Sequence, residues 1–148
     1  MTPSVHRRAW LAHAATVMSA VVLAGCATAG AGGGSPEGDK AALAKRAQAY
    51  WSLVQANDRV GAWAYEALSK NPEGSLEGYL KRGGINYEAV EVREVRSIEG
   101  DKAIVDVFMR FSVPLIRIKG QEAVTQDEWQ RIDGQWYHVL KRSVMFPS

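Results

Sequence analysis

The sequence predicts an α+β domain in which N-terminal helices pack on a curved antiparallel sheet. Apolar residues recur every three or four positions between residues 40 and 80, as on one face of a helix. From residue 89 onward they alternate with polar residues, as in strands. Asp133-Gly134 lies between two strand-like segments, which is the usual signature of a two-residue hairpin turn. Helices first and strands afterwards is an α+β order.

Three helical segments are expected before the strands. The first begins near Lys40, with Asp39 as its N-cap. Its apolar side comprises Leu43, Ala47, Tyr50, Trp51 and Val54. Asn57-Asp58 interrupts the pattern, and the second stripe comprises Val60, Trp63, Ala64, Ala67 and Leu68. Ser75 is expected to cap a short third helix that stops at Gly83-Gly84.

The strand region divides into at least four segments. Residues 89–98 alternate with a change of phase between Val92 and Val95, as a β-bulge would produce. Residues 102–113 carry apolar side chains on both faces, which predicts a central strand covered on both sides. Residues 113–119 either continue that strand past Pro114 or begin an edge strand. Residues 122–132 and 135–142 form the last two strands.

The Asp133-Gly134 turn fixes the pairing of these last two strands. A two-residue loop pairs Trp129 with His138 and Arg131 with Trp136, and puts all four side chains on one face. Aromatic residues and arginine are enriched at protein interfaces, so this sheet face is a candidate homodimer surface. The alternative is that the two tryptophans cover the domain's own helix.

Residues 1–25 have the pattern of a secretory signal peptide. Arg7 and Arg8 precede an apolar run, residues 9–24, that is shorter than the roughly 20 residues needed to cross a membrane. Leu23-Ala24-Gly25-Cys26 resembles the lipobox of bacterial lipoproteins, which implies cleavage before Cys26 and lipidation of its thiol. Cys26 is the only cysteine, so an intrachain disulfide is excluded.

The resemblance implies a protein anchored in a lipid membrane of the cell envelope through Cys26. Ala27, rather than aspartate, follows the cysteine, which implies sorting to the outer membrane, facing the periplasm, in a Gram-negative host. The arginine pair in His6-Arg7-Arg8 also resembles a twin-arginine export signal, and an ordinary signal peptide is the alternative.

Removal of the signal peptide changes the charge of the chain. The full sequence has 18 Lys and Arg against 16 Asp and Glu, a formal net charge of +2. Arg7 and Arg8 would leave with residues 1–25 and no acid would, so the remaining chain is formally neutral. No nucleic acid is therefore expected as a partner. Residues 26–39 are rich in Gly and Ala and form a predicted flexible tether, which leaves residues 40–148 as one domain.

Several short motifs follow one another along this domain. Tyr50-Trp51 and Asp58 precede Ala64-Tyr65 and Gly78-Tyr79-Leu80, and the Trp129-to-Tyr137 hairpin comes last. In this order they resemble the nuclear transport factor 2-like family, whose cone-shaped fold SnoaL-like polyketide cyclases and ketosteroid isomerases share. The resemblance implies an apolar pocket between a helix and a curved sheet. A cystatin-like helix-on-sheet domain has the same element order and is the alternative.

Three side chains are weak candidates for chemistry in such a pocket. Asp106, if buried, would have a raised pKa suited to a general base, whereas a pair with Arg110 would make it structural. Tyr65 would donate a hydrogen bond to a carbonyl, as the resemblance to ketosteroid isomerases implies, or be a core residue, and the same two interpretations apply to Tyr50. His138 would act as an acid or base near neutral pH, or be a half-exposed histidine packed on Trp129.

The lining of the pocket is the feature that distinguishes the possible functions. The lining candidates are Tyr50, Trp63, Val107 and Met109. A small, wholly apolar lining would indicate a scaffold, whereas a buried carboxylate facing a tyrosine would indicate an enzyme.

Neither a metal nor a cofactor is expected. His6 and His13 lie in the signal segment, and one remaining histidine without a second cysteine does not make a zinc site. The sequence has no phosphate-binding loop and no dinucleotide motif. We therefore expect an envelope lipoprotein whose domain binds or scaffolds a protein partner or a small apolar ligand. The alternative is a pocket enzyme of the ketosteroid-isomerase, polyketide-cyclase or dehydratase type.

Overall fold

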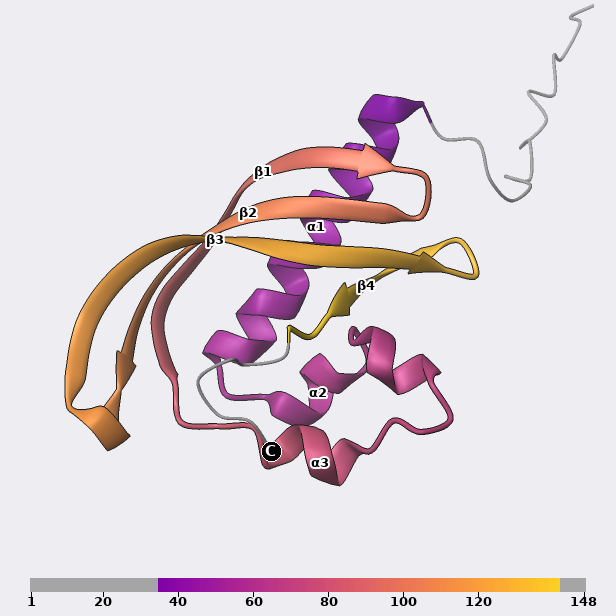
Figure 1. The fold of residues 1–148 in the computed structure, drawn as a ribbon. Helices are drawn as coiled ribbons and strands as arrows, with labels where there is room; N and C mark the ends of the chain where they lie inside the picture. The colour runs from indigo at the N-terminus through magenta and orange to yellow at the C-terminus, as the bar shows by residue number, and fades with distance from the viewer. Residues whose placement is uncertain (1–34, 142–148) are drawn as a thin grey trace, which may run out of the picture. The chain divides into compact units, whose positions relative to one another are not determined.

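The computed structural model describes residues 35–141. The elements follow in the order α1 (Pro36–Gln55), α2 (Arg59–Trp63), η1 (Ala67–Lys70), α3 (Leu76–Leu80), β1 (Asn86–Glu99), β2 (Lys102–Val113), η2 (Pro114–Ile116), β3 (Ile118–Ile132) and β4 (Gln135–Val139) (Figure 1). Helices thus precede one sheet, and the predicted α+β class is confirmed. None of the helices in this range has the length and apolar character needed to cross a membrane. Cys26 and the rest of the predicted lipoprotein signal lie outside the described residues.

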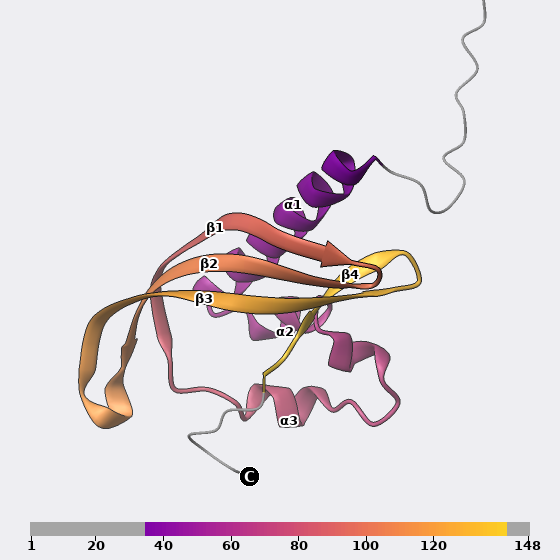
Figure 2. The ribbon, with the colours of Figure 1, turned by 45° about the horizontal axis from the view of Figure 1, so that its top comes forward.

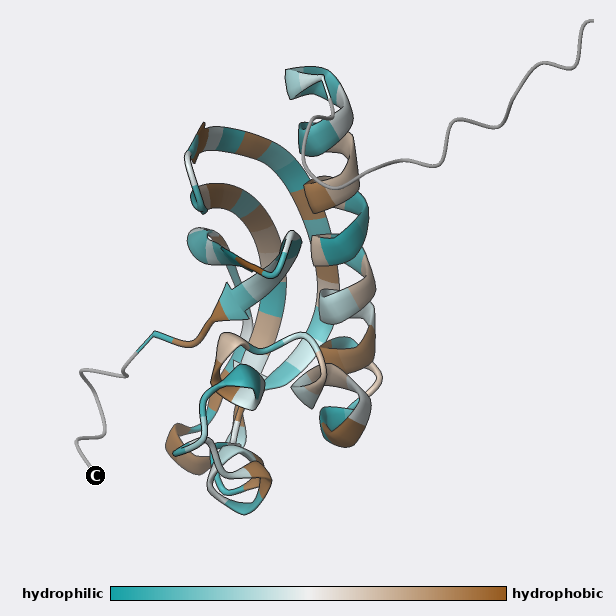
Figure 3. Cartoon of the chain, turned by 90° about the vertical axis from the view of Figure 1, so that its right-hand side faces the viewer, coloured by the Kyte–Doolittle hydropathy of each residue, from teal (hydrophilic) through white to brown (hydrophobic). Residues whose placement is uncertain are grey.

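The sheet is antiparallel throughout, with strand order β1-β2-β3-β4. The predicted bulge is present, because the register of β1 against β2 shifts between Val92 and Glu94 and at two further points. Bulges increase the local twist and bend the strand. The sheet is correspondingly curved, and α1 runs along one of its faces (Figures 1 and 3).

The core lies between α1 and this inner face of the sheet. The inward side chains of β2 are all at most 6% exposed: Ala103, Val105, Val107 and Met109. On the outer face Ile104 and Phe108 are only half-buried, and no helix of the described residues covers them (Figure 2). β2 is therefore central, as predicted, but the expectation that it is covered on both sides is wrong. All three α-helices precede the sheet and pack on a single side of it.

Helix α1 begins earlier than the sequence predicts. Its N-cap is Ser35, whose hydroxyl accepts a hydrogen bond from the Gly38 N–H at 3.2 Å. Pro36 suits the first turn, where an N–H would have no helical partner. Residues 36–39, assigned to the tether, are therefore helical. Asp39, the expected cap, instead accepts a hydrogen bond from the Trp136 indole at 3.0 Å and pairs with Arg131.

The second predicted helical stripe is broken in the structure. α2 ends at Trp63, and Glu66 forms a parallel bridge with His138 before η1 begins. The His138 N–H donates to the Tyr65 carbonyl at 2.8 Å. Pairing with β4 thus overrides the local helical pattern, and Val60 is left 62% exposed.

The two hairpins at the C-terminal half of the sheet differ in their turns. Asp133 and Gly134 have φ values of 50° and 78°, and β3 pairs with β4 in the predicted register. The segment after Val113 does not continue β2. Pro114 has no N–H to donate to the ladder, so β2 ends, η2 turns the chain, and β3 begins at Ile118.

Strand β1 is an edge strand, and α1 covers part of its open edge. The Gln48 side-chain oxygen accepts a hydrogen bond from the Val92 N–H at 3.0 Å. Gln55 donates from its amide to the Glu88 carbonyl, also at 3.0 Å. These contacts satisfy backbone groups that would otherwise be free to pair with another chain.

Candidate functional site

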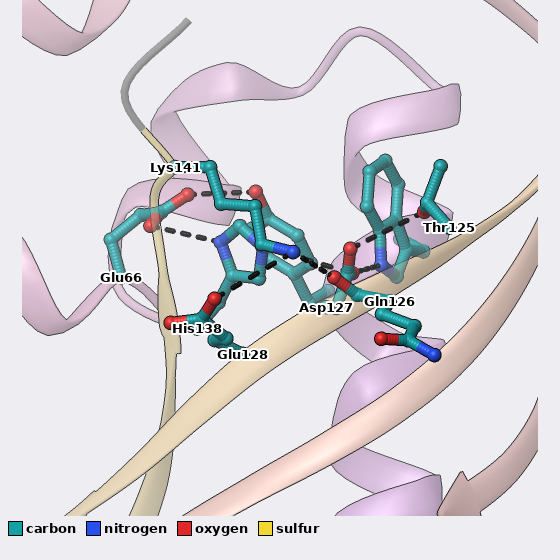
Figure 4. Close-up of polar contacts among 9 residues, drawn as sticks. Glu66, Thr125, Gln126, Asp127, Glu128, His138 and Lys141 are labelled. Atoms are coloured by element: carbon teal, nitrogen blue, oxygen red, sulfur yellow. Dashed lines mark hydrogen bonds and ion pairs between the residues drawn. The ribbon is translucent and has the colours of Figure 1, made fainter.

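Three ionisable side chains are buried together in the interior (Figure 4). Glu66 is 0% exposed, His138 6% and Asp127 7%. With Tyr50 and Trp51, which contact them, we call these residues the buried polar cluster. Burial of charged groups is costly unless they are paired and hydrogen-bonded, so the contacts within the cluster decide whether it is stable.

Four separate parts of the chain supply the cluster. Tyr50 and Trp51 lie on the buried side of α1. Glu66 lies in the break between α2 and η1, where its bridge to β4 turns the side chain inward. Asp127 of β3 and His138 of β4 lie on the inner face of the sheet. The cluster therefore joins both halves of the fold.

The His138 imidazole lies between the two carboxylates (Figure 4). Its Nδ1 is 3.1 Å from Glu66 Oε2, within hydrogen-bond distance. When Glu66 is ionised, its carboxylate only accepts hydrogen bonds, so Nδ1 is then the donor in this contact. The Nε2 atom is 3.7 Å from Asp127 Oδ2, a distance suited to an ion pair.

Tyr50 binds the second oxygen of the Glu66 carboxylate. Its hydroxyl donates to Glu66 Oε1 at 2.7 Å, and its ring stacks on the His138 ring with centroids 4.4 Å apart. Burial, followed by the negative charge of Glu66, raises the pKa of the Tyr50 hydroxyl well above its ordinary value. This hydroxyl therefore remains protonated and serves as a donor.

Asp127 also accepts hydrogen bonds from neutral donors. The Trp51 indole N–H donates to Oδ2 at 2.6 Å, and the Thr125 hydroxyl lies 3.5 Å from Oδ1. Burial raises the pKa of Asp127, while the nearby His138 and the bond from Trp51 oppose that shift. Each carboxylate oxygen of the cluster thus has a hydrogen-bond donor of the same chain beside it.

The structure changes the interpretation of His138. The sequence predicts a half-exposed histidine packed on Trp129, and the indole is indeed in contact, with ring centroids 5.6 Å apart. The imidazole, however, is buried between two acids. The expectation of half-exposure is wrong because Glu66, which covers the ring, comes from a segment 72 residues away in sequence.

Asp106 lies on the opposite face of the sheet from the cluster. It accepts hydrogen bonds from Arg96, whose Nε is 2.9 and 3.1 Å from its two oxygens. The predicted pair with Arg110 is wrong, because the shifts in β1 bring Arg96 beside Asp106, and Arg110 pairs with Glu88 and Glu122. The bond from Arg96 lowers the pKa of Asp106, contrary to the need of a neutral-pH general base.

Tyr65 does not face a buried carboxylate. Its half-buried ring lies beneath the Arg46 guanidinium, 4.5 Å from the ring centroid. The same guanidinium lies 5.0 Å from the centroid of Tyr137 and donates to the Trp136 carbonyl. Tyr65 and Asp106 are therefore not brought together, and the tyrosine that meets a buried carboxylate is Tyr50.

Three of the four residues predicted to line a pocket fill the interior instead. Tyr50, Val107 and Met109 are 3%, 0% and 6% exposed and belong to one packed hydrophobic core. Trp63 is half-buried and lies outside this core, where it packs against Tyr79 with ring centroids 5.3 Å apart.

The tryptophans of the last hairpin are also part of the core. Trp129 is 1% exposed and Trp136 is 4% exposed. Both pack in the same cluster as the apolar side of α1. They therefore cover the domain's own helix, and they do not form an exposed surface for a second copy.

The outer face of the sheet contains an open hollow that is separate from the buried polar cluster. It is lined by Ser97, Glu99, Lys102, Ala103, Ile104, Glu128, Trp129, Gln130 and Val139. Over residues 35–141 no group of three or more His, Cys, Asp and Glu side chains is placed to hold a metal ion.

Two members of the cluster, Glu66 and Asp127, are missing from the site residues that the sequence predicts. Glu66 falls in a stretch with helical periodicity, and nothing nearby indicates that it is buried. Asp127 does carry a signal, because it lies two residues before Trp129 and so shares its face of the strand. An acid on the same face as a buried tryptophan is unusual, since aspartate is rarely buried without a partner.

Comparison with known proteins does not assign this chain to a family. No protein-family model matches the chain, and no curated protein matches it. One similar solved structure is a chain described as an NTF2-like transpeptidase from Campylobacter jejuni. It is 16% identical, with a TM-score of 0.41, over 64% of this chain and 94% of that one. Neither an activity nor a partner is transferred from that protein to this chain.

Proposed function

We propose that this chain is a lipid-anchored protein of the bacterial cell envelope whose domain binds or scaffolds a partner without catalysing a reaction. The anchor is proposed at Cys26, because Leu23-Ala24-Gly25 precedes it and an apolar run follows Arg7 and Arg8. In a Gram-negative host we expect the outer membrane, facing the periplasm.

One observation carries the non-catalytic part of the proposal. The carboxylates of the buried polar cluster are bound within the domain: both oxygens of Glu66 and both of Asp127 already have donors from this chain. Of the side chains expected to line a pocket, Tyr50, Val107 and Met109 are packed in the core. A catalytic acid or base needs a free approach to the proton it transfers.

A single substitution at the lipobox tests the anchor. We expect Cys26→Ser to abolish incorporation of labelled fatty acid and to leave either uncleaved precursor or soluble protein. A Cys26→Ser protein that is still processed and tightly membrane-bound would contradict the anchor. Ala27→Ser, which keeps the cysteine, serves as the control.

A pocket enzyme of the ketosteroid-isomerase, cyclase or dehydratase type is the second candidate. The observation that favours it is the buried carboxylate of Glu66 facing the Tyr50 hydroxyl at 2.7 Å, with His138 alongside. Proton transfer between a tyrosine, a histidine and a carboxylate is typical of general acid–base catalysis.

Tyr50→Phe distinguishes the two candidates, because it removes one hydroxyl and keeps the ring. If the domain is a binding module, the phenotype of the variant in cells should follow only its folded amount. Loss of the phenotype with thermal stability intact would indicate an enzyme. Asp106→Asn, on the other face of the sheet, is the control and should leave the phenotype unchanged.

A further inference from the structure

The turn between β2 and β3 ends in exposed apolar side chains. In both ribbon views this hairpin reaches away from the three helices (Figures 1 and 2). At its end, Leu115 is 80% exposed and Ile116 is 52% exposed. Both belong to η2, directly after Pro114. A single exposed apolar residue is common, but two adjacent ones at a projecting tip form a small patch that the domain itself does not cover.

Two basic residues follow this patch in the sequence. Arg117 and Lys119 are both exposed, and within residues 35–141 neither forms an ion pair. Arg110, farther along the hairpin, is already paired with Glu88 and Glu122. The end of the hairpin therefore carries two exposed apolar residues and two exposed basic residues without an ion pair.

We propose that this tip, residues 114–119, inserts into the surface of an anionic lipid bilayer. Leu115 and Ile116 would enter the acyl boundary while Arg117 and Lys119 contact the phosphates of the headgroups. Apolar side chains backed by basic ones are the composition that binds such interfaces. The proposal rests on the proposed anchor at Cys26, which keeps the domain beside a membrane.

A bilayer suits this patch better than a protein partner does. A stable protein interface buries about 800 Å² on each side and has a well-packed centre. Two side chains on a convex turn do not supply such an area, whereas a bilayer deforms around a point contact. The weak affinity expected of so small a tip becomes effective when a lipid anchor makes the contact intramolecular.

The contact also implies an orientation for the domain. Ser35, where α1 begins, and the hairpin tip lie at opposite ends of the described domain (Figures 1 and 2). Cys26 lies nine residues before Ser35, so an anchor there and a tip contact on the same bilayer are compatible when α1 lies along the membrane plane.

The test places a nitroxide spin label at the tip of the full lipoprotein in vesicles that contain phosphatidylglycerol. Lipidation consumes the only native thiol, so Leu115→Cys supplies a single labelling position. We expect this label to collide with oxygen far more than with a water-soluble nickel complex, as a label in acyl chains does. Lys102→Cys, at the other end of β2, is the matched control and should remain aqueous. Equal aqueous exposure at both positions would overturn the proposal.

Removal of the charges tests the lipid specificity. Arg117→Gln combined with Lys119→Gln should reduce the inserted fraction relative to the free fraction by roughly thirtyfold in anionic vesicles. The same change should have no effect in phosphatidylcholine vesicles. A second copy of the chain at the tip would shield the label at residue 115 from both oxygen and the nickel complex, and would do so only at high protein concentration. That result would overturn the proposal.

Failure of the anchor is recognised separately. Two reactive thiols per chain in the Leu115→Cys protein would show that Cys26 is not lipidated, which contradicts the proposed function. Leu115→Cys together with Cys26→Ser, held on the same vesicles by an N-terminal histidine tag and a nickel-chelating lipid, then reports on the tip without the native anchor. Insertion in that protein supports the tip proposal, and an aqueous label contradicts it.

Discussion

Glu66 links α1 to β4 within the buried polar cluster. It is completely buried, and its two oxygens bind Tyr50 from α1 and His138 from β4. Without it, a tyrosine hydroxyl and an imidazole N–H would remain in the core with no acceptor. A buried polar group without a hydrogen-bond partner costs more free energy than a formed hydrogen bond contributes. The network is therefore stable only when it is complete.

Glu66→Ala should therefore be strongly destabilising. We expect the free energy of unfolding to fall by about 3–5 kcal/mol, as for other broken buried ion pairs, measured by urea denaturation. Glu91→Ala is the control, because Glu91 forms an exposed pair with Arg93 and should contribute less than about 1 kcal/mol. Equal losses in both variants would contradict the proposed importance of the cluster.

The raised pKa of Asp127 predicts how the stability of the domain depends on pH. Its pKa is raised in the folded protein above the ordinary value of 3.8, so the folded state binds the proton more tightly than the unfolded state. That contribution to stability is fully present below the unfolded pKa and is lost as pH rises through the folded one. Asp127→Asn does not titrate, so its stability relative to the wild type should increase as pH rises from about 4 through the raised folded pKa of Asp127.

Asp106→Asn should show the opposite sign. The Arg96 bond lowers the pKa of Asp106, so its contribution is present above 3.8 and is lost as pH falls through the lower folded value. The wild type should be the more stable protein at neutral pH, and the difference should shrink in acid. Thermal unfolding across the pH range measures the stability of both variants. If the difference in stability between a variant and the wild type does not depend on pH, the direction of the pKa shift assigned to that aspartate is wrong.

At the scale of the elements, α1 both forms the core and protects an edge of the sheet. One side of the helix packs on the inner face of the sheet, and Gln48 reaches around to the backbone of β1 at Val92. A sheet edge without such cover tends to pair with other chains. The polar side of the helix therefore has a structural role of its own.

Gln48→Ala should free the edge at one point. We expect faster hydrogen exchange of the Val92 amide and a loss of about 1 kcal/mol in the free energy of unfolding, because this half-buried N–H loses its acceptor. Gln55→Ala is the control. Gln55 binds the Glu88 carbonyl, so its removal should leave exchange at Val92 unchanged. Unaltered exchange in Gln48→Ala would show that water replaces the glutamine.

At the scale of the whole molecule, the domain extends to Ser35 at its N-terminal side. The Ser35 hydroxyl caps α1, and Asp39 in the first turn binds both Trp136 and Arg131 near the last hairpin. The two sequence-distant ends of the described fold are thus held together.

A chain that starts at Ser35 should unfold cooperatively without lipid, as followed by thermal denaturation. A chain that starts at Gly38 should be less stable by about 1 kcal/mol, because it loses the N-cap. Equal stabilities would show that the cap contributes nothing. Failure of both chains to fold would show that residues before Ser35 belong to the domain.

The sequence by itself determines the features that depend on neighbouring residues. Helical and strand periodicity predicted the class and order of the elements, and Asp133-Gly134 predicted the turn and the pairing of Trp129 with His138. The phase change after Val92 predicted the bulge. Each of these is a local consequence of backbone geometry. The lipobox at Cys26 is also purely local, and it stays a prediction.

Only the tertiary structure decided what surrounds each polar side chain. Glu66 is buried because its bridge to His138 outweighs the helical pattern of its own segment. Asp106 is paired with Arg96 because register shifts in β1 move that arginine along the sheet. Whether a side chain is exposed, paired or reactive depends on groups far away in sequence, and a periodicity in one segment contains no information about them.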